Sequence, residues 1–403
     1  MTLATLTLAI ALSAPAQTTD DELRARAERL HREAIVLDTH ADLTPFIEKD
    51  TKPVEIADPG LSGPAYDPGS DPLHAEIAGP WVASFPSGPW KFTERHSDGY
   101  MDLPRMREGG LDAEFFAIYM EEEPRPGMAV KRALGQIEAV LALCDKYRDA
   151  IALATTAEDV RRIAASGRIA ALMGVEGGYM IEDDLRVLRL FHRLGVRYMS
   201  LTHSFNTHWA DSSGTGEPVP PRHRGLSPFG VEVVKEMNRL GMMVDVSHTA
   251  DSTFYDVLEA TEAPVIASHS SVDGVKEHAR NLSDDMLRAL ARNGGVIHID
   301  TVIKYIDPID PGERPKTPLS VFIDHIAHAI EVAGADHVGL GLDYGYDAPA
   351  PEGLEHIGKL GAVTYELLKR GYDEETVRKV LGENTLRVMA EVEAVATRLS
   401  ERR

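Results

Sequence analysis

Short apolar runs alternate with longer segments of helical periodicity along most of this chain. Nine runs have the length and composition of buried strands: 34–39, 114–120, 150–155, 169–175, 196–202, 242–247, 264–268, 295–301 and 337–342. The segments between them predict helices, among them 129–147, 184–194, 229–240, 284–293, 319–333 and 356–370. Such alternation is typical of parallel sheets, because each helix carries the chain back to the start of the next strand. The pattern predicts an α/β protein built from βα units.

Several of these runs end in a residue type that binds metal ions. The first run ends in His40 and Asp42, whose side chains point to the same side of an extended strand. Later runs end at Glu176, His203, His248, His269 and Asp343. A core or capping role is the simpler explanation for any one of them, but the agreement of six strand ends predicts a metal site. Imidazole and carboxylate ligands suit a divalent cation such as zinc.

This arrangement favours a TIM-type (β/α)8 barrel. Such a barrel gathers the carboxyl ends of all its strands on one face, where barrel enzymes have their active sites. A closed barrel needs eight strands, so one of the nine runs is extra. We assign 150–155 as the extra run, because it is short and no ligand-type residue follows it. A doubly wound open sheet is the alternative, but its chemistry usually lies at a single switch point.

Composition narrows the possible partners. The chain has 403 residues, 42 of them basic and 64 acidic, which gives a net charge of −22. An acidic surface argues against nucleic acid or an anionic membrane as a partner. The single cysteine, Cys144, excludes an intrachain disulfide and a cysteine-based zinc site, and its helical context predicts a buried, inert thiol.

Two segments stand apart from the βα pattern. Residues 1–16 are small and apolar and end in Ala14-Pro15-Ala16, which is typical of a signal peptide, although no Lys or Arg precedes the apolar stretch. We therefore expect a periplasmic or secreted protein whose mature chain, 17–403, is one domain not inserted in the membrane. Residues 51–100 are rich in Pro, Gly and aromatic residues. They predict a loop insertion after the first strand that overhangs the catalytic face as a lid or a fixed wall.

The candidate ligands lie in longer motifs that together resemble a known family. These motifs include Asp38-Thr39-His40-Ala41-Asp42, Gly174-Val175-Glu176-Gly177-Gly178, Leu201-Thr202-His203-Ser204, Val244-Asp245-Val246-Ser247-His248, Ser268-His269-Ser270-Ser271 and Gly341-Leu342-Asp343. Over about residues 33–393 the chain resembles the membrane (renal) dipeptidases, binuclear zinc enzymes of the amidohydrolase superfamily. The resemblance implies a (β/α)8 dipeptidase, a homodimer, that cleaves short peptides, L,D-dipeptides among the candidates, with a metal-bridged hydroxide.

The resemblance also implies how two zinc ions are held. His40 and Asp42 would bind the first ion, and His248 and His269 the second. Glu176 would bridge both ions, since the two oxygens of a carboxylate can span metals about 3.5–4 Å apart.

Four further residues take roles by the same resemblance. His203 would donate a hydrogen bond to the carbonyl oxygen as it becomes an oxyanion. Asp343 would take a proton from the attacking water and pass it to the leaving amine. Arg280 would bind the substrate carboxylate through its planar guanidinium. Tyr305 would assist at that end, although its surroundings depart from the family pattern.

Two rival functions follow from the same residues. An amidohydrolase of this fold that acts on N-acyl amino acids or a lactam would use Arg280 equally well. A non-catalytic barrel would need a lost ligand, but all five ligand positions are filled.

The remaining polar candidates are expected to be structural. Asp245 and Asp211 should orient the imidazoles from behind, whereas His298 and His208 read as structural. The other histidines read as surface residues: His31, His74, His96, His192, His223, His278, His325, His328, His337 and His356.

Overall fold

Eight parallel strands close into a ring in this computed structural model, which describes residues 19–51, 90–96, 99–120, 127–216, 219–309, 316–345 and 350–402. The ring runs β2-β1-β9-β8-β7-β6-β5-β4, and pairing of β2 with β4 closes it. Its strands are β1 (Leu37–Ala41), β2 (Ala113–Ile118), β4 (Ile169–Val175), β5 (Val196–Ser200), β6 (Met243–Asp245), β7 (Ile266–Ala267), β8 (Val296–Ile299) and β9 (Val338–Leu340). The predicted (β/α)8 barrel is confirmed.

The ninth run lies outside this ring, as the sequence indicated. It forms β3 (Ile151–Leu153), which pairs in parallel with the first three residues of β4. β4 continues beyond this contact and pairs with β5 through its second half. The short strand therefore lies beside the start of β4 and takes no part in closing the ring.

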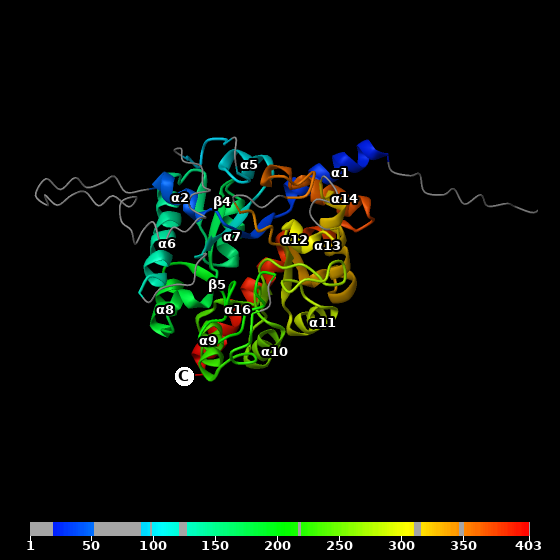
Figure 1. The fold of residues 1–403 in the computed structure, drawn as a ribbon. Helices are drawn as coiled ribbons and strands as arrows, with labels where there is room; N and C mark the ends of the chain where they lie inside the picture. Colours follow the sequence, from blue (N-terminus) through cyan, green and yellow to red (C-terminus); the bar gives the residue numbers. More distant parts are fainter. Residues whose placement is uncertain are drawn as a thin grey trace, which may run out of the picture.

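Helices surround the barrel and carry the chain between strands (Figure 1). They are α1 (Asp20–Glu33), α2 (Thr44–Thr51), α5 (Leu103–Glu108), α6 (Ala129–Lys146), α7 (Ala157–Ala164), α8 (Leu185–Arg193), α9 (Pro228–Leu240), α10 (Asp251–Ala260), α11 (Asp284–Asn293), α12 (Ile303–Ile306), α13 (Leu319–Ala333), α14 (Gly361–Lys369), α15 (Glu374–Arg378) and α16 (Asn384–Glu401). The helices begin and end where local chemistry requires it. For example, the Ser227 hydroxyl caps α9, and Gly241 ends it in the left-handed conformation.

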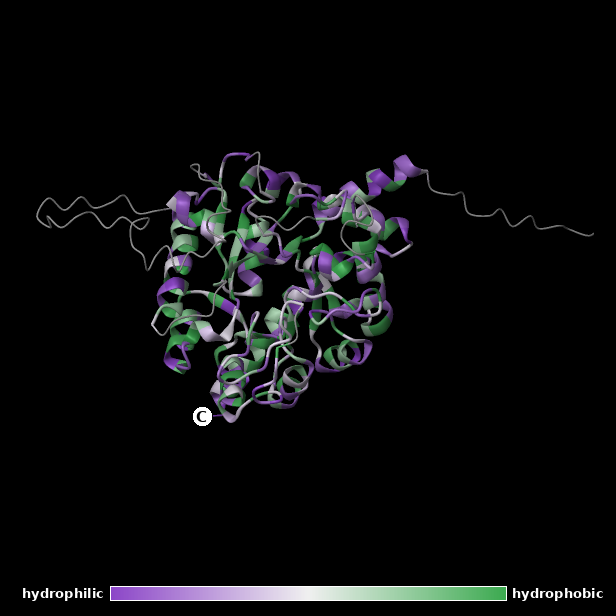
Figure 2. Ribbon diagram, in the orientation of Figure 1, coloured by the Kyte–Doolittle hydropathy of each residue, from purple (hydrophilic) through white to green (hydrophobic). Residues whose placement is uncertain are grey.

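Buried apolar side chains form the core of the barrel and of the layer between barrel and helices. The ribbon in Figure 2 shows many hydrophobic residues along the strands and hydrophilic residues interspersed along the surrounding helices. Inside the ring, the Tyr198 side chain crosses the space above Gly174, and the Phe115 ring packs against it with centroids 5.1 Å apart. No helix among the described residues is long and apolar enough to cross a membrane.

Two sequence expectations fall mostly outside the described residues. The apolar segment 1–16 and most of the loop 51–100 belong to this part of the chain. The end of the loop is described, and there Trp90 and Phe92 are buried, with the Trp90 ring 5.7 Å from that of Phe46. Cys144 is partly buried, and burial raises the pKa of its thiol to about 12, in keeping with an inert role.

Gly174 should not tolerate a side chain. A Cβ at this position would lie 1.9 Å from Cζ of Tyr198, whose ring is held on all sides. We expect Gly174→Ala to lower the free energy of unfolding by at least about 1–3 kcal/mol, the usual cost of overpacking, in urea denaturation. The matched control is Gly135→Ala in the exposed middle of α6, where the nearest atom would be 3.5 Å away. It should stabilise the helix by up to about 1 kcal/mol. Equal effects of the two changes would contradict this account.

Candidate metal centre and active site

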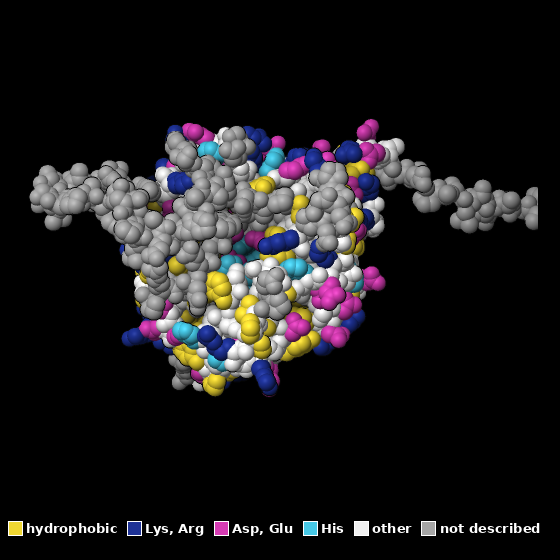
Figure 3. Space-filling model, in the orientation of Figure 1, with side chains coloured by type: hydrophobic (Ala, Val, Ile, Leu, Met, Phe, Trp, Pro, Cys, Tyr) yellow, Lys and Arg dark blue, Asp and Glu magenta, His cyan; other side chains and the backbone are white. Residues whose placement is uncertain are grey.

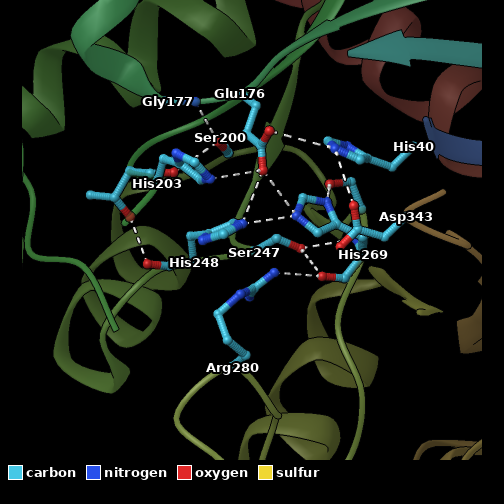
Figure 4. Close-up of polar contacts among 12 residues, drawn as sticks. His40, Glu176, Gly177, Ser200, His203, Ser247, His248, His269, Arg280 and Asp343 are labelled. Atoms are coloured by element: carbon cyan, nitrogen blue, oxygen red, sulfur yellow. Dashed lines mark hydrogen bonds and ion pairs between the residues drawn. The ribbon is translucent and has the colours of Figure 1, made fainter. Parts of the chain in front are cut away.

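The strand ends converge on the carboxylate of Glu176, which follows β4. Its Oε1 lies 3.0 Å from His248 Nε2, 3.2 Å from His269 Nε2 and 3.7 Å from His203 Nε2. Its Oε2 lies 3.6 Å from His40 Nε2 on the other side. Figure 4 shows the four imidazoles pointing toward this one carboxylate from different strands. The two oxygens of Glu176 therefore face two different sets of ring nitrogens.

A second group of carboxylates lies on the His40 side. His40 Nε2 is 3.4 Å from Asp42 Oδ1 and 3.8 Å from Asp343 Oδ1. All seven strand-end residues named from the sequence are thus brought together. They form three overlapping groups that could hold a metal ion: His40, Glu176 and His269; Glu176, His203 and His248; His40, Asp42 and Asp343. Histidine side chains also gather near the middle of the face drawn in Figure 3.

Two of these residues have a left-handed backbone conformation, which residues other than glycine rarely adopt. His248 has φ 66° and Asp343 has φ 55°. Left-handed backbone at such residues costs on the order of 1 kcal/mol and persists where the surrounding structure holds it. In both cases the turn directs the side chain from the strand end into the cluster, which is the pattern expected of a functional position.

Hydrogen bonds behind His269 fix the orientation of its ring. Its Nδ1 lies 2.8 Å from Ser268 Oγ, and that hydroxyl donates to Asp245 Oδ2 at 2.6 Å. Because the one hydroxyl hydrogen goes to the carboxylate, Nδ1 of His269 donates and Nε2 presents a lone pair to Glu176. Asp245 therefore acts on this imidazole through Ser268, as a relay that the sequence did not reveal.

Asp211 does not have the role expected for it. Its carboxylate accepts hydrogen bonds from the backbone N–H groups of Arg222, His223 and Gly225. These contacts hold the loop after β5 and touch no ligand imidazole. The residue follows a histidine-rich motif in the sequence, but the chain turns away from the site before reaching it.

The donor set fits a divalent metal ion. His40 Nε2 and Asp42 Oδ1, which face each other at 3.4 Å, are buried without a hydrogen-bond partner. His248 Nε2 and His269 Nε2 lie 2.9 Å apart, and both face the same carboxylate oxygen. Buried polar atoms normally find partners, and a cation among these nitrogens and oxygens would give each of them one. Imidazole nitrogens with carboxylate oxygens are ligands that zinc prefers.

Burial and mutual charge change the acidity of this cluster. Burial raises the pKa of Asp343 to about 7. Burial alone would also raise the pKa of Glu176. The four imidazoles around it outweigh this effect of burial, and its pKa is held well below the usual range. Glu176 is therefore an anion, while Asp343 is balanced between its two protonation states.

Arg280 lies at the edge of the cluster with unused hydrogen-bonding capacity. The residue is 2% exposed, and its Nη2 donates to the carbonyl oxygen of His269 at 3.0 Å. Its Nε and Nη1 have no partner. The guanidinium carbon lies 5.5 Å from the centre of the Tyr305 ring, which also packs against His278 at 4.6 Å. A buried cation with two free donors is costly unless an anion completes the site.

The remaining histidines are not all buried or exposed as the sequence suggested. His298 is structural: its Nδ1 lies 2.9 Å from the Ala267 carbonyl oxygen, and its Nε2 lies 2.9 Å from Thr385 Oγ1. His208 is exposed and pairs with Asp183.

The expectation of a surface position was wrong for His31 and His325, which are buried and hydrogen-bonded on both ring nitrogens. Both lie on the buried faces of their helices, and the polar residue type gave no indication of this burial.

A (β/α)8 barrel with imidazoles and carboxylates at its strand ends defines a metal-dependent hydrolase. The sequence model of the membrane dipeptidase family, peptidase family M19, matches residues 24–403, and the chain belongs to this family. It is 38% identical over 312 residues to the dipeptidase verJ of Clonostachys rogersoniana, covering 75% of this chain and 78% of that relative. The chain is therefore a metal-dependent dipeptidase, as its motifs implied.

Solved structures agree with this fold. The probable dipeptidase PvdM from Pseudomonas aeruginosa superposes with a TM-score of 0.76 at 23% identity, over 93% of this chain and 100% of that one. A metallopeptidase from Rhodobacter sphaeroides, liganded with a phosphinate mimic of the dipeptide L-Ala-D-Ala, superposes with a TM-score of 0.71 at 26% identity. That likeness covers 89% of this chain and 99% of the other.

Proposed function

We propose that this enzyme hydrolyses the amide bond of free dipeptides at a centre of two zinc ions. The observation that carries the proposal is Arg280, a buried guanidinium with two unpaired nitrogens that donates to the backbone of His269. A substrate carboxylate bound there would lie next to the imidazole cluster. The amide that reacts must then lie close to that carboxylate, as the one amide of a dipeptide does.

The ligand geometry supports the assignment of two ions. His40 and Asp42 would hold the first, and His248 and His269 the second. Glu176 would serve both, because its Oε2 faces His40 while its Oε1 faces the other two histidines. A bound zinc pair would supply Lewis acidity for the amide carbonyl and acidify a water molecule at neutral pH.

The chain's own residues would then manage the proton and the developing charge. Asp343, near His40, would take the proton of the attacking water and return it to the amine nitrogen of the leaving residue. His203, whose pKa is lowered by burial, would be a neutral imidazole that donates one N–H to the carbonyl oxygen as negative charge grows there. Arg280 would hold the terminal carboxylate, with Tyr305 beside it.

Substrate stereochemistry and location extend the proposal. The phosphinate complex of the Rhodobacter sphaeroides relative supports dipeptides with a D-residue in the second position as substrates. The small apolar residues 1–16, which end in Ala14-Pro15-Ala16, support export to the periplasm or the medium. The family resemblance supports a homodimer.

Free dipeptides should be hydrolysed in preference to blocked ones. We expect turnover of L,L- and L,D-dipeptides by the zinc-loaded enzyme, measured by release of the second amino acid. N-acetyl amino acids present the same carboxylate to Arg280 but no free amine. If they were the better substrates, the enzyme would be an N-acyl amino acid amidohydrolase.

Two zinc ions should bind per chain. Five ligand residues exceed what a single three-ligand site needs, and Glu176 offers an oxygen to each side. Elemental analysis of protein purified without chelator should give two ions. His208→Gln, which alters an exposed histidine paired with Asp183, should leave this number unchanged. A ratio of one that does not rise on adding zinc would contradict the bridging role.

Asp343→Asn should keep the metal ions but lose turnover. The amide has nearly the shape of the carboxylate, so packing is preserved while proton transfer is lost. General acid–base catalysis contributes roughly 10²–10⁴-fold, so kcat should fall by that factor with the metal content unchanged. A variant with the kcat of the parent enzyme would reassign Asp343 to a structural role.

Arg280→Ala should weaken the enzyme selectively toward substrates with a free carboxylate. Charge-assisted hydrogen bonds contribute roughly 1.5–3 kcal/mol each, so kcat/KM for a free dipeptide should fall on the order of 10²-fold. For the corresponding dipeptide amide, already a poor substrate, the loss should be small.

Arg288→Ala, an exposed arginine paired with Asp284 and Asp285, is the matched control and should leave both substrates unaffected. If the effects of losing Arg280 and of losing the substrate charge simply multiply, the two groups do not meet.

A further inference from the structure

The Tyr198 side chain reaches across the barrel to the back of His40. It begins on β5, and its hydroxyl oxygen lies 2.8 Å from His40 Nδ1 and 3.0 Å from the carbonyl oxygen of Thr39. In the ring of strands, β4 and β2 separate β5 from β1. The crossing is possible because Gly174 has no side chain, and the Phe115 ring packs on the tyrosine. The hydroxyl thus has a fixed position in the buried interior.

The direction of both hydrogen bonds follows from the number of hydrogens available. A tyrosine hydroxyl carries one hydrogen. The carbonyl of Thr39 can only accept, so the hydroxyl donates to it. His40 Nδ1 must then donate its N–H to the hydroxyl oxygen. The remaining ring nitrogen, Nε2, faces Asp42, Glu176 and Asp343.

We propose that Tyr198 is the positioning residue of the first metal site. Its hydroxyl, anchored by Thr39, holds the hydrogen of His40 on Nδ1 and so presents the lone pair of Nε2 to the metal. This inference rests on the proposed role of His40 as a ligand. The second site has a different device, because the Ser268 hydroxyl and the Asp245 carboxylate hold the ring of His269.

Loss of the hydroxyl should therefore affect one metal ion and spare the other. Without it, Nδ1–H of His40 loses its acceptor, and the ring gains from moving its hydrogen to Nε2, where carboxylates lie within 4 Å. That hydrogen would occupy the position of the metal. Removing an outer partner of a ligand histidine typically costs about 10–100-fold in metal affinity.

Tyr198→Phe tests this, since it removes one oxygen atom and keeps the ring. The two stepwise dissociation constants for zinc, measured by competition with a chelator, should respond separately: one should rise about 10–100-fold and the other should not change. Ser268→Ala should raise the opposite constant. If Tyr198→Phe leaves both constants as in the parent enzyme, or raises both equally, the proposal is overturned.

Thr364→Val provides the matched control for a merely structural effect. It also removes a buried hydroxyl bonded to a buried histidine, since Thr364 Oγ1 lies 2.7 Å from His31 Nδ1, outside the active site. It should lower the melting temperature and leave both zinc constants unchanged. A change in zinc binding similar to that of Tyr198→Phe would show that any lost hydroxyl has this effect, and would overturn the proposal.

His40→Ala distinguishes the two levels of the argument. If it leaves both constants unchanged, His40 is no ligand, and the proposed metal assignment fails together with the inference. If it raises one constant while Tyr198→Phe raises neither, the assignment stands and only the role of Tyr198 is wrong.

A measurement on the unaltered enzyme needs no variant to fold. In nitrogen–proton correlation spectra of the zinc-loaded protein, the His40 ring should carry its hydrogen on Nδ1 and none on Nε2. The reverse pattern would overturn the proposal.

Discussion

A carboxylate buried among imidazoles is the interaction on which this structure depends. Glu176 sits at the carboxyl end of β4 with almost no contact with water, and four histidines face it. A buried charge is tolerated only when opposite charge or strong hydrogen bonds surround it. The imidazoles come from β1, β5, β6 and β7, so the barrel must close for the carboxylate to be compensated. The closed barrel and the site therefore depend on each other.

The interior of the barrel supports the site from below. Polar groups lie among the apolar side chains there, and some of them hold rings that face the candidate metal centre. Tyr198 contacts His40, and Asp245 contacts His269 through Ser268. Such contacts hold a ring in the orientation that metal binding requires. Little side-chain entropy is then lost when an ion binds. The small residue Gly174 belongs to this support, since it makes room for the tyrosine.

Arg280, the residue proposed to bind the substrate carboxylate, lies at the edge of the imidazole cluster. Arg280 is fixed by the backbone of a candidate ligand, His269, and by stacking against Tyr305. The group that would read the substrate's end is thus tied to the group that would hold the metal. With a carboxylate held there, an amide one residue away would lie next to the candidate metal centre. This agrees with the dipeptidase family to which the chain belongs.

The sequence by itself determined the strands, their parallel arrangement and the residues at their ends. Period and length mark an apolar run such as 169–175, and a ligand-type residue after it is visible without a structure. It also allowed the extra strand at 150–155 to be set aside, since nothing chemical follows it. These features are local, so they can be recognised from the order of residues along the chain.

Only the tertiary structure decided which groups act on one another. Tyr198 and Ser268 read as ordinary strand residues, yet they contact imidazoles 158 positions away and one position away, respectively. His31 and His325 read as surface residues and are buried, while Asp211 follows a motif of the site and turns away from it. The closure of the ring sets these distances, and no single stretch of sequence encodes it. The residue types show which chemical groups are available, but the fold determines where each hydrogen and each lone pair points.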